Sequence, residues 1–285
     1  MLYYSKILQI STEPDLVKEW TFMKITALVE NRTNRGLNVR HGLSLYIETA
    51  KHKILFDVGP DNTLFENCEK LGVDLLKVDT VVLSHGHYDH GGALEQFLKI
   101  NNSAKIYAQK KAFDPHYAKR FFVKKDISVD PGLKTRAQMR LLNGDHQIDD
   151  ELFLFTTPDI SKYRSGANDT LYSAAGKDDF SHEQSLMVLG DTNVLIMGCG
   201  HAGIVNILEK ASAYKPQVCV GGYHLWNPVT KKTVPDKLLD GIAQELAKYN
   251  IRYYTCHCTG SEAHGYLAGR LPDMNYLSCG GVIQL

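Results

Sequence analysis

The chain has 285 residues, of which 44% are hydrophobic, and it carries 32 basic and 32 acidic side chains. This length and apolar content suit one large domain with a full core. The balanced charge excludes a general nucleic-acid binder, which needs a basic surface. No apolar run is long enough to cross a membrane and no secretory signal is recognisable, so we expect neither a nucleic-acid nor a membrane partner. The six cysteines are scattered, which favours reduced thiols in the cytoplasm over a disulfide framework.

The start of the chain differs in character from the rest. Residues 1–22 mix charges with short apolar pieces, and we interpret them as an N-terminal extension, with translation beginning at either Met1 or Met23. From residue 23 onward, strand and helix patterns alternate without a linker that would require a second domain. Residues 23–285 are therefore expected to form one domain.

The first elements of that domain surround a polar loop. We expect strands at 23–29, 41–48 and 53–57, followed by a helix at 61–71. The loop at 30–40 and the residue that follows it carry polar side chains suited to facing a substrate. For each of them a solvated hairpin is the alternative. The substrate-binding candidates are Asn31, Arg32, Arg35 and His41.

The densest chemical signal lies at Ser84-His85-Gly86-His87-Tyr88-Asp89-His90-Gly91-Gly92. An apolar, β-branched run at 80–83 precedes it and predicts a buried strand. A helix pattern at 93–98 follows it. The ligand-type side chains therefore lie on a strand-to-helix turn, where they can converge above a sheet edge.

Imidazole nitrogens and carboxylate oxygens are ligands that zinc, iron and manganese accept. One metal rarely takes four ligands from six consecutive residues, because the backbone cannot wrap around it. We therefore assign His85 and His87 to one metal and Asp89 and His90 to a second.

The periodic pattern weakens after an expected strand at 105–108. Residues 109–180 combine basic pairs with aromatic side chains and an irregular, polar stretch. We expect this segment to contain a cap or rim over the site, whose cations would meet an anionic substrate. An ordinary solvated helix and loop is the alternative. The aromatic members are Phe113, Tyr117, Phe121 and Phe122.

The second half of the chain repeats one pattern, a strand followed by a junction that carries a histidine. Expected strands at 194–197, 217–222 and 251–256 run into junctions that carry His201, His224 and His257. Small residues beside these histidines let the backbone approach a metal. A helix is expected at 235–248 and a last strand at 276–285. Two halves that each end in histidine-bearing turns support a sandwich of two sheets.

The HxHxDH pattern from His85 to His90 resembles the metallo-β-lactamase superfamily. This resemblance implies an α/β fold, a four-layer αββα sandwich, with one or two metals at a sheet edge and usually a hydrolytic activity. Within the superfamily, the chain is similar to the branch of dihydropterin ribofuranosyl-aminobenzene phosphate synthases over residues 23–285. That similarity is carried by 41–44, 198–206, 221–225 and 256–260.

The resemblance also implies further ligands. His201 would complete the first site and His257 the second. His182, with Glu183 beside it, is the alternative to His201. Asp57 matches an aspartate behind the metals that accepts a hydrogen bond and orients the ligand turn, although an aspartate at a strand end is otherwise a common turn-former.

One position departs from the superfamily pattern. Cys199 stands where the aspartate that bridges the two metals is usual. Three interpretations remain open for Cys199, namely a thiolate ligand, a redox-sensitive neighbour or a small buried residue.

The expected activity follows from these assignments. Two divalent ions, zinc first with manganese or iron as alternatives, would generate a hydroxide that attacks a phosphate ester or a related small anionic substrate such as a pterin phosphate. Asp89 and His224 are the expected catalytic residues, with His224 stabilising an oxyanion or donating a proton. An iron-dependent oxidoreductase of the same fold and a non-catalytic ligand-binding protein are the alternatives.

Overall fold

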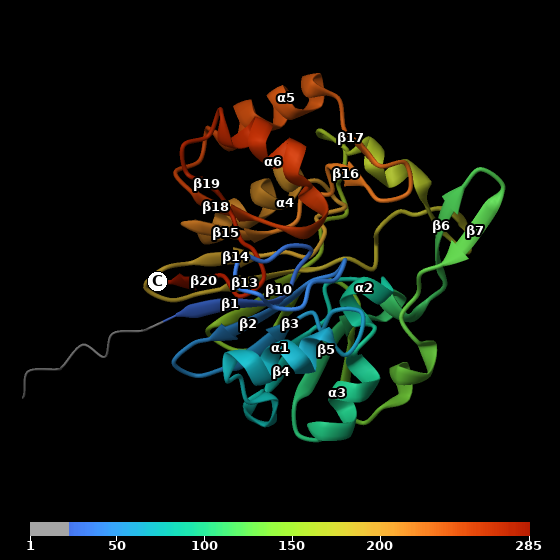
Figure 1. The fold of residues 1–285 in the computed structure, drawn as a ribbon, viewed down its shortest axis with the longest axis vertical. Helices are drawn as coiled ribbons and strands as arrows, with labels where there is room; N and C mark the ends of the chain where they lie inside the picture. The colour runs from blue at the N-terminus through green and yellow to red at the C-terminus, as the bar shows by residue number, and fades with distance from the viewer. Residues whose placement is uncertain (1–22) are drawn as a thin grey trace, which may run out of the picture.

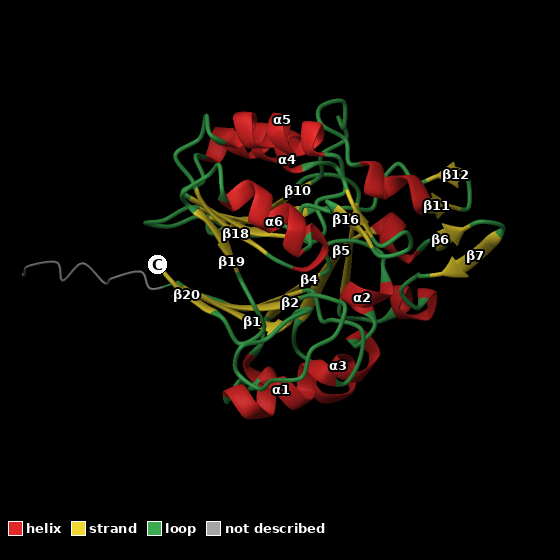
Figure 2. Cartoon of the chain, turned by 45° about the horizontal axis from the view of Figure 1, so that its top comes forward, coloured by secondary structure: helices red, strands yellow, loops and turns green. Residues whose placement is uncertain are grey.

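The computed structural model describes residues 23–285, and the expected extension at 1–22 lies outside them. Two seven-stranded sheets face each other, with helices on the outer face of each (Figures 1 and 2). The mixed α/β sandwich expected from the sequence is confirmed. No helix in the described part of the chain is long and apolar enough to cross a membrane.

The first sheet is built mainly from the N-terminal half. Its central strands are apolar on both faces and buried on both faces, as expected for strands inside a four-layer stack. In spatial order the sheet contains β20 (Val282–Gln284), β1 (Lys24–Val29), β2 (Ser44–Glu48), β3 (Lys53–Phe56), β4 (Thr80–Val82), β5 (Lys105–Gln109) and β8 (Met139–Leu142).

The second sheet is built from the C-terminal half. Strands β14, β15, β18 and β19 run parallel to one another, so their carboxyl ends share one edge. In spatial order the sheet contains β19 (Met274–Tyr276), β18 (Arg252–Thr255), β15 (Val218–Gly221), β14 (Val194–Ile196), β13 (Ser185–Val188), β10 (Leu152–Phe155) and β9 (His146–Gln147).

Three apolar clusters hold the layers together. One lies between the sheets, and the other two lie between each sheet and its helices. The helices that follow the first-sheet strands are α1 (Thr63–Leu71), α2 (Tyr88–Gly91) and α3 (Leu94–Ile100). Those on the second sheet are α4 (Ile204–Ala211), α5 (Asp236–Leu246) and α6 (Ser261–Ala268).

The segment 109–180 contributes a small sheet of its own. Its strand order is β12 (Gly176–Lys177), β11 (Leu171–Ser173), β6 (His116–Arg120) and β7 (Val123–Asp126). The hairpin of β6 and β7 projects from the sandwich (Figure 1). A second short hairpin pairs β16 (Trp226–Asn227) with β17 (Lys232–Thr233).

The end of the chain differs from the expected single strand at 276–285. Strand β19 belongs to the second sheet, whereas β20 pairs with β1 in the first. The backbone turns between them at Gly280, whose φ of 79° favours glycine. The apolar pattern continues through this turn, so it gave no sign of the change of sheet.

Candidate metal centre

The ligand-type side chains gather at one edge of the sandwich. The turn after β4 carries His85, His87, Asp89 and His90, and it belongs to the first sheet. The junctions after β14, β15 and β18 belong to the second sheet, and their parallel strands bring these junctions to a common edge. They carry His201, His224 and His257.

The structure brings all six sequence-predicted metal ligands together, and all six are buried. The ring nitrogens face each other at short range. His85 Nε2 lies 3.0 Å from His87 Nδ1, and His90 Nε2 lies 3.2 Å from His257 Nε2. Opposed nitrogen lone pairs repel each other unless a proton or a cation lies between them, so this donor set fits a bound metal.

Unpartnered nitrogens support the same conclusion. Among the described residues, His87 Nε2 and His201 Nε2 are buried and have no hydrogen-bond partner. The ligand atoms of His201, His85 and Cys199 all lie within 4.8 Å of one another. Buried imidazole nitrogens without partners are costly unless they bind a cation or an acceptor.

Cys199 lies between the two expected metal positions. Its Sγ is 3.2 Å from His90 Nε2. Its sulfur also lies within 4.8 Å of the ligand atoms of His90 and His257, and separately within 4.8 Å of those of His85 and His201. The thiol therefore occupies a position from which a thiolate can ligate either metal.

His41 and Asp89 extend this centre. His41 Nε2 and His257 Nε2 lie 3.4 and 3.5 Å from Asp89 Oδ2. Burial raises the pKa of Asp89, but the neighbouring His90, His257 and His41 outweigh it and hold that pKa well below the usual range. Burial, followed by the proximity of His257, lowers the pKa of His41 to about 4. Asp89 is therefore a carboxylate and His41 a neutral imidazole near pH 7.

Asp57 contacts the ligand turn through two of its members, Ser84 and His90. Its carboxylate accepts hydrogen bonds from Ser84 N and Ser84 Oγ, both at 2.7 Å, and lies 2.6 Å from His90 Nδ1. Burial lowers the pKa of His90, but Asp57 and Asp89 outweigh it and raise that pKa to about 9. A cation on His90 Nε2 would replace the extra proton. Asp57 itself has a φ of 61°, a strained conformation typical of functional sites.

His201 is held by a glutamate and an asparagine. Glu183 Oε1 accepts a hydrogen bond from the backbone N–H of His201 at 2.8 Å. Asn168 Oδ1 lies 2.9 Å from His201 Nδ1, and Asn168 Nδ2 donates to the His201 carbonyl at 2.9 Å. These contacts fix the ring and leave Nε2 facing the centre.

His257 is held in the same way by a different segment. Glu30 Oε1 accepts a hydrogen bond from the backbone N–H of His257 at 2.7 Å. Asn31 Oδ1 lies 3.0 Å from His257 Nδ1, and Asn31 Nδ2 donates to the His257 carbonyl at 3.2 Å. We call these two arrangements the Glu–Asn clamps. Glu30 and Asn168 were not predicted as site residues, and the sequence signal for Glu30 is only that of an acidic residue directly after a buried strand.

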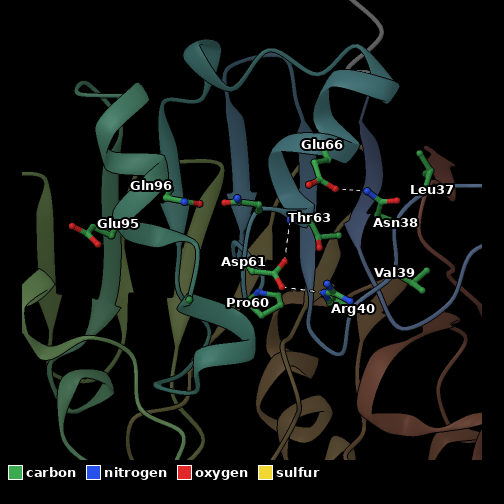
Figure 3. Close-up of a pocket in the computed structure, with 12 residues that line it drawn as sticks. Leu37, Asn38, Val39, Arg40, Pro60, Asp61, Thr63, Glu66, Glu95 and Gln96 are labelled. Carbon is green, nitrogen blue, oxygen red and sulfur yellow. Dashed lines mark hydrogen bonds and ion pairs between the residues drawn. The ribbon is translucent and has the colours of Figure 1, made fainter.

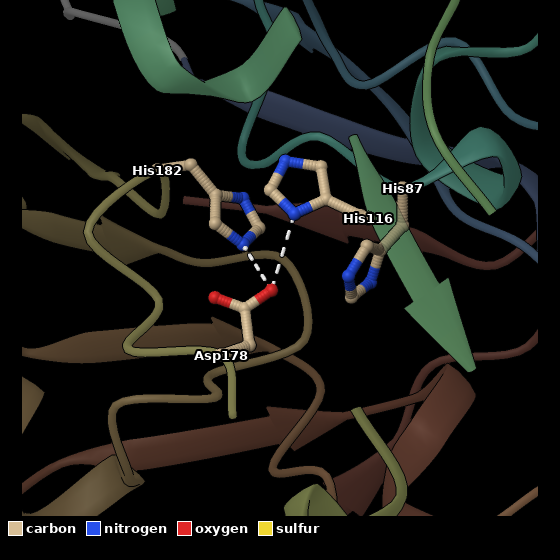
Figure 4. A group of neighbouring side chains, drawn as sticks. All are labelled: His87, His116, Asp178 and His182. Atoms are coloured by element: carbon tan, nitrogen blue, oxygen red, sulfur yellow. Dashed lines mark hydrogen bonds and ion pairs between the residues drawn. The ribbon is translucent and has the colours of Figure 1, made fainter. Parts of the chain in front are cut away.

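A group of polar side chains lies behind His87 (Figure 4). His182 Nδ1 accepts a hydrogen bond from Gly86 N at 3.0 Å, and its Nε2 lies 3.3 Å from Asp178 Oδ2. His116 Nδ1 lies 3.1 Å from the same oxygen. Both ring nitrogens of His182, the alternative to His201, are therefore engaged outside the centre, where they hold the peptide between two ligands.

A cavity of about 650 Å³ opens onto the metal centre. His224 lines it, and neither of its ring nitrogens has a hydrogen-bond partner among the described residues; its backbone φ is 46°. A larger cavity of about 910 Å³ lies between α1, α3 and the loop around Arg40 (Figure 3). The described residues that line it include no histidine or cysteine. Chemistry, not size, therefore identifies the smaller cavity as the candidate site.

The four expected substrate-binding residues divide between two places. His41 lines the smaller cavity. Asn31 instead holds His257, and the Arg32 guanidinium lies 5.1 Å from the ring centroid of Tyr276. Neither Arg32 nor Arg35 is among the residues that line this cavity. Thr33, between them, instead pairs with Cys279, in the segment that joins β19 and β20.

The family model of the metallo-beta-lactamase superfamily matches residues 37–203, which is more than half of the chain. The chain belongs to the metallo-beta-lactamase superfamily. It is 30% identical to the uncharacterized protein MJ0448 of Methanocaldococcus jannaschii, over 84% of this chain and 91% of that protein. It is 27% identical to the 7,8-dihydropterin-6-methyl-4-(beta-D-ribofuranosyl)-aminobenzene-5'-phosphate synthase of the same organism, over 92% and 96% of the two chains.

Among solved structures, the superfamily member Tm1679 is described as a metal-dependent hydrolase. It superposes with a TM-score of 0.76 and 25% identity, covering 92% of this chain and 98% of Tm1679. YhfI of Bacillus subtilis shares the fold, with a TM-score of 0.59 and 12% identity over 93% of this chain and all of that one. The sandwich fold is thus shared with these structures.

Proposed function

We propose that this protein is a metal-dependent hydrolase that acts on a phosphate ester or a related small anionic substrate. The observation that carries the proposal is the cluster of buried, mutually facing imidazoles at the floor of a cavity. Superfamily membership and the similarity to Tm1679 support it. The relative from M. jannaschii that is named as a dihydropterin phosphate synthase makes a pterin phosphate one member of the substrate class.

Two divalent cations, zinc first, fit the donor set. His85, His87 and His201 would hold one, and Asp89, His90 and His257 the other. Cys199 lies close to both groups, within 4.8 Å of the ligand atoms of His85 and His201 and of those of His90 and His257. When bound, such cations supply positive charge that polarises a substrate oxygen and lowers the pKa of water toward neutrality.

Three side chains of the protein would act on the water and the substrate. Asp89, as a carboxylate, accepts a proton or a hydrogen bond from the attacking water. His224 lines the cavity, and within residues 23–285 its two ring nitrogens have no hydrogen-bond partner, so it is placed to protonate the leaving oxygen. His41, a neutral imidazole on the cavity wall, orients the substrate by a hydrogen bond.

The test is hydrolysis of a panel of aryl phosphomonoesters and phosphodiesters by protein loaded with zinc, manganese or iron. We expect turnover that His85→Ala abolishes and that His224→Ala lowers by about 10²–10⁴-fold, the usual contribution of a general acid. His146→Ala is the matched control, because His146 lies on β9 and lines neither cavity. Unchanged turnover in His85→Ala would refute the proposal, and redox activity found only with iron would favour the oxidoreductase.

A further inference from the structure

The cavity over the metal centre has a second wall that the hydrolytic reaction does not use. This wall comes from the β6–β7 hairpin, from β11 and from the turn between β16 and β17. It is almost wholly apolar. Its members are Ala118, Phe121, Phe122, Val123, Ile127, Leu171, Pro228 and Val229.

The hairpin sorts its side chains between two faces. Successive residues of a strand point to opposite sides, and in β7 the residues Val123 and Lys125 line the cavity whereas Lys124 does not. On the outer face, the ammonium groups of Lys119 and Lys124 lie 5.5 and 5.3 Å from the ring centroid of Tyr172. Two of the cations in the basic segment are therefore turned away from the cavity, and the cavity face of the hairpin is apolar apart from Lys125.

The tip of the hairpin exposes large apolar side chains to solvent. Phe122 is fully exposed, and Phe121 and Val123 are 79% and 70% exposed. A cluster of exposed apolar side chains usually marks a binding surface. These three side chains also line the cavity that contains His87, Cys199 and the other centre residues, so the surface continues directly into the candidate active site.

The base of the hairpin is coupled to the metal centre. Ile127, Leu171 and Phe180 form a small apolar cluster beneath it. The ring of Phe180 stacks on His201, with a centroid distance of 4.6 Å and an interplanar angle of 4°. The apolar wall is thus held at a fixed place relative to a candidate ligand.

Two cations complete the cavity. Lys125 and Lys231 both line it. The ammonium of Lys125 lies 5.5 Å from the ring centroid of Tyr88 and that of Lys231 lies 5.0 Å from the ring centroid of Trp226, and neither ammonium is ion-paired with a carboxylate of the residues that the structure describes. We propose that the apolar wall binds an aromatic ring system of the substrate, with Lys125 and Lys231 attracting its anionic group. The position of the reacting bond rests on the proposed function, but ring binding does not, because it can be measured without turnover.

The test compares two non-hydrolysable ligands with the same anionic head, 1-naphthylphosphonate and methylphosphonate, by calorimetry on metal-loaded protein. We expect tighter binding of the naphthyl compound, and we expect the exposed double substitution Phe122→Ser with Val123→Ser to weaken its binding about tenfold, consistent with loss of part of the buried apolar area. Binding of methylphosphonate should not change. Leu76→Ser is the matched control, because Leu76 is also exposed but lies outside this cavity.

The lysines are tested on one strand. Lys125→Met should lower the affinity for both phosphonates. Lys124→Met, on the outer face of the same strand, should leave both affinities unchanged. Equal affinities of wild-type protein for the two ligands would overturn the proposal. It would also be overturned if the double substitution turned a dimer into a monomer with unchanged ligand binding, because the wall would then be a contact between two copies. Absence of hydrolysis with ring binding intact would overturn only the proposed function.

Discussion

The Glu–Asn clamps predict that metal affinity depends on side chains that do not touch the metal. Asn168→Ala removes the contact with His201 Nδ1 and the hydrogen bond to the His201 carbonyl, both at 2.9 Å. The imidazole then loses the group that fixes its orientation and its tautomer. Loss of such a partner typically lowers metal affinity by about 10–100-fold. Two buried hydrogen bonds also contribute about 1–3 kcal/mol to folding.

The control for this prediction is another buried asparagine, Asn101. Its amide donates to the carbonyls of Leu75 and Val78, and its oxygen accepts from the backbone of Ser103 and Ala104, far from the centre. Asn101→Ala should therefore reduce the free energy of unfolding of metal-stripped protein at least as much as Asn168→Ala does.

The two variants should differ in a zinc titration against a chromophoric chelator. Asn168→Ala should show weakened binding of one of the two ions, and Asn101→Ala should bind both as the wild type does. Equal zinc affinity in the two variants would refute the positioning role of the clamp. A parallel loss in both would assign the effect to stability alone.

Three further predictions follow from other contacts. Cys199→Asp should retain two metals but should lose the thiolate-to-metal charge-transfer band of the cobalt-substituted protein; an unchanged spectrum would show that the thiol is not a ligand. Burial lowers the pKa of His52, but Asp79 and Asp149 outweigh it and raise that pKa above its ordinary value. The stability that the protonated His52 contributes is present in full below about pH 6.5 and is lost as the pH rises through the raised pKa. His52→Gln should therefore lower the free energy of unfolding, measured in urea, by more at pH 6 than at pH 9. A loss of the same size at both pH values would contradict the assignment. Gly86→Ala should destabilise the protein by about 1–3 kcal/mol through overpacking, because the added Cβ would lie 2.2 Å from a backbone oxygen. The control is Gly190→Ala, whose Cβ would meet no atom of the described residues within 4 Å. Equal free energies of unfolding for the two variants would contradict the crowding at Gly86.

The sequence was sufficient for features that are local. The turn from His85 to His90 could be recognised in the sequence because its four ligand-type side chains lie within six residues, between a strand pattern and a helix pattern. His201 and His257 could be selected because each follows a buried strand and neighbours a glycine or cysteine of small volume. The alternation of strands and helices predicted the sandwich for the same reason, since each element has its own apolar pattern.

The features that escaped prediction depend on contacts across long stretches of chain. Asn31 meets His257 across 226 residues, and Asn168 meets His201 across 33. An asparagine in a polar loop has the same sequence signature whether it faces a substrate or holds a ligand, which is why Asn31 was placed with the substrate. The facing direction of Lys124 and Lys125 was equally hidden, because it depends on the register of the hairpin with β11.

The central claim is that this edge of the sandwich is a two-metal centre. It is tested most directly by elemental mass spectrometry of protein purified without chelators and without a metal-binding tag. The account predicts about two divalent transition ions per chain, the stoichiometry of a two-metal hydrolytic site. It also predicts about one ion per chain in His201→Ala. A folded wild-type protein with one ion or none would contradict it.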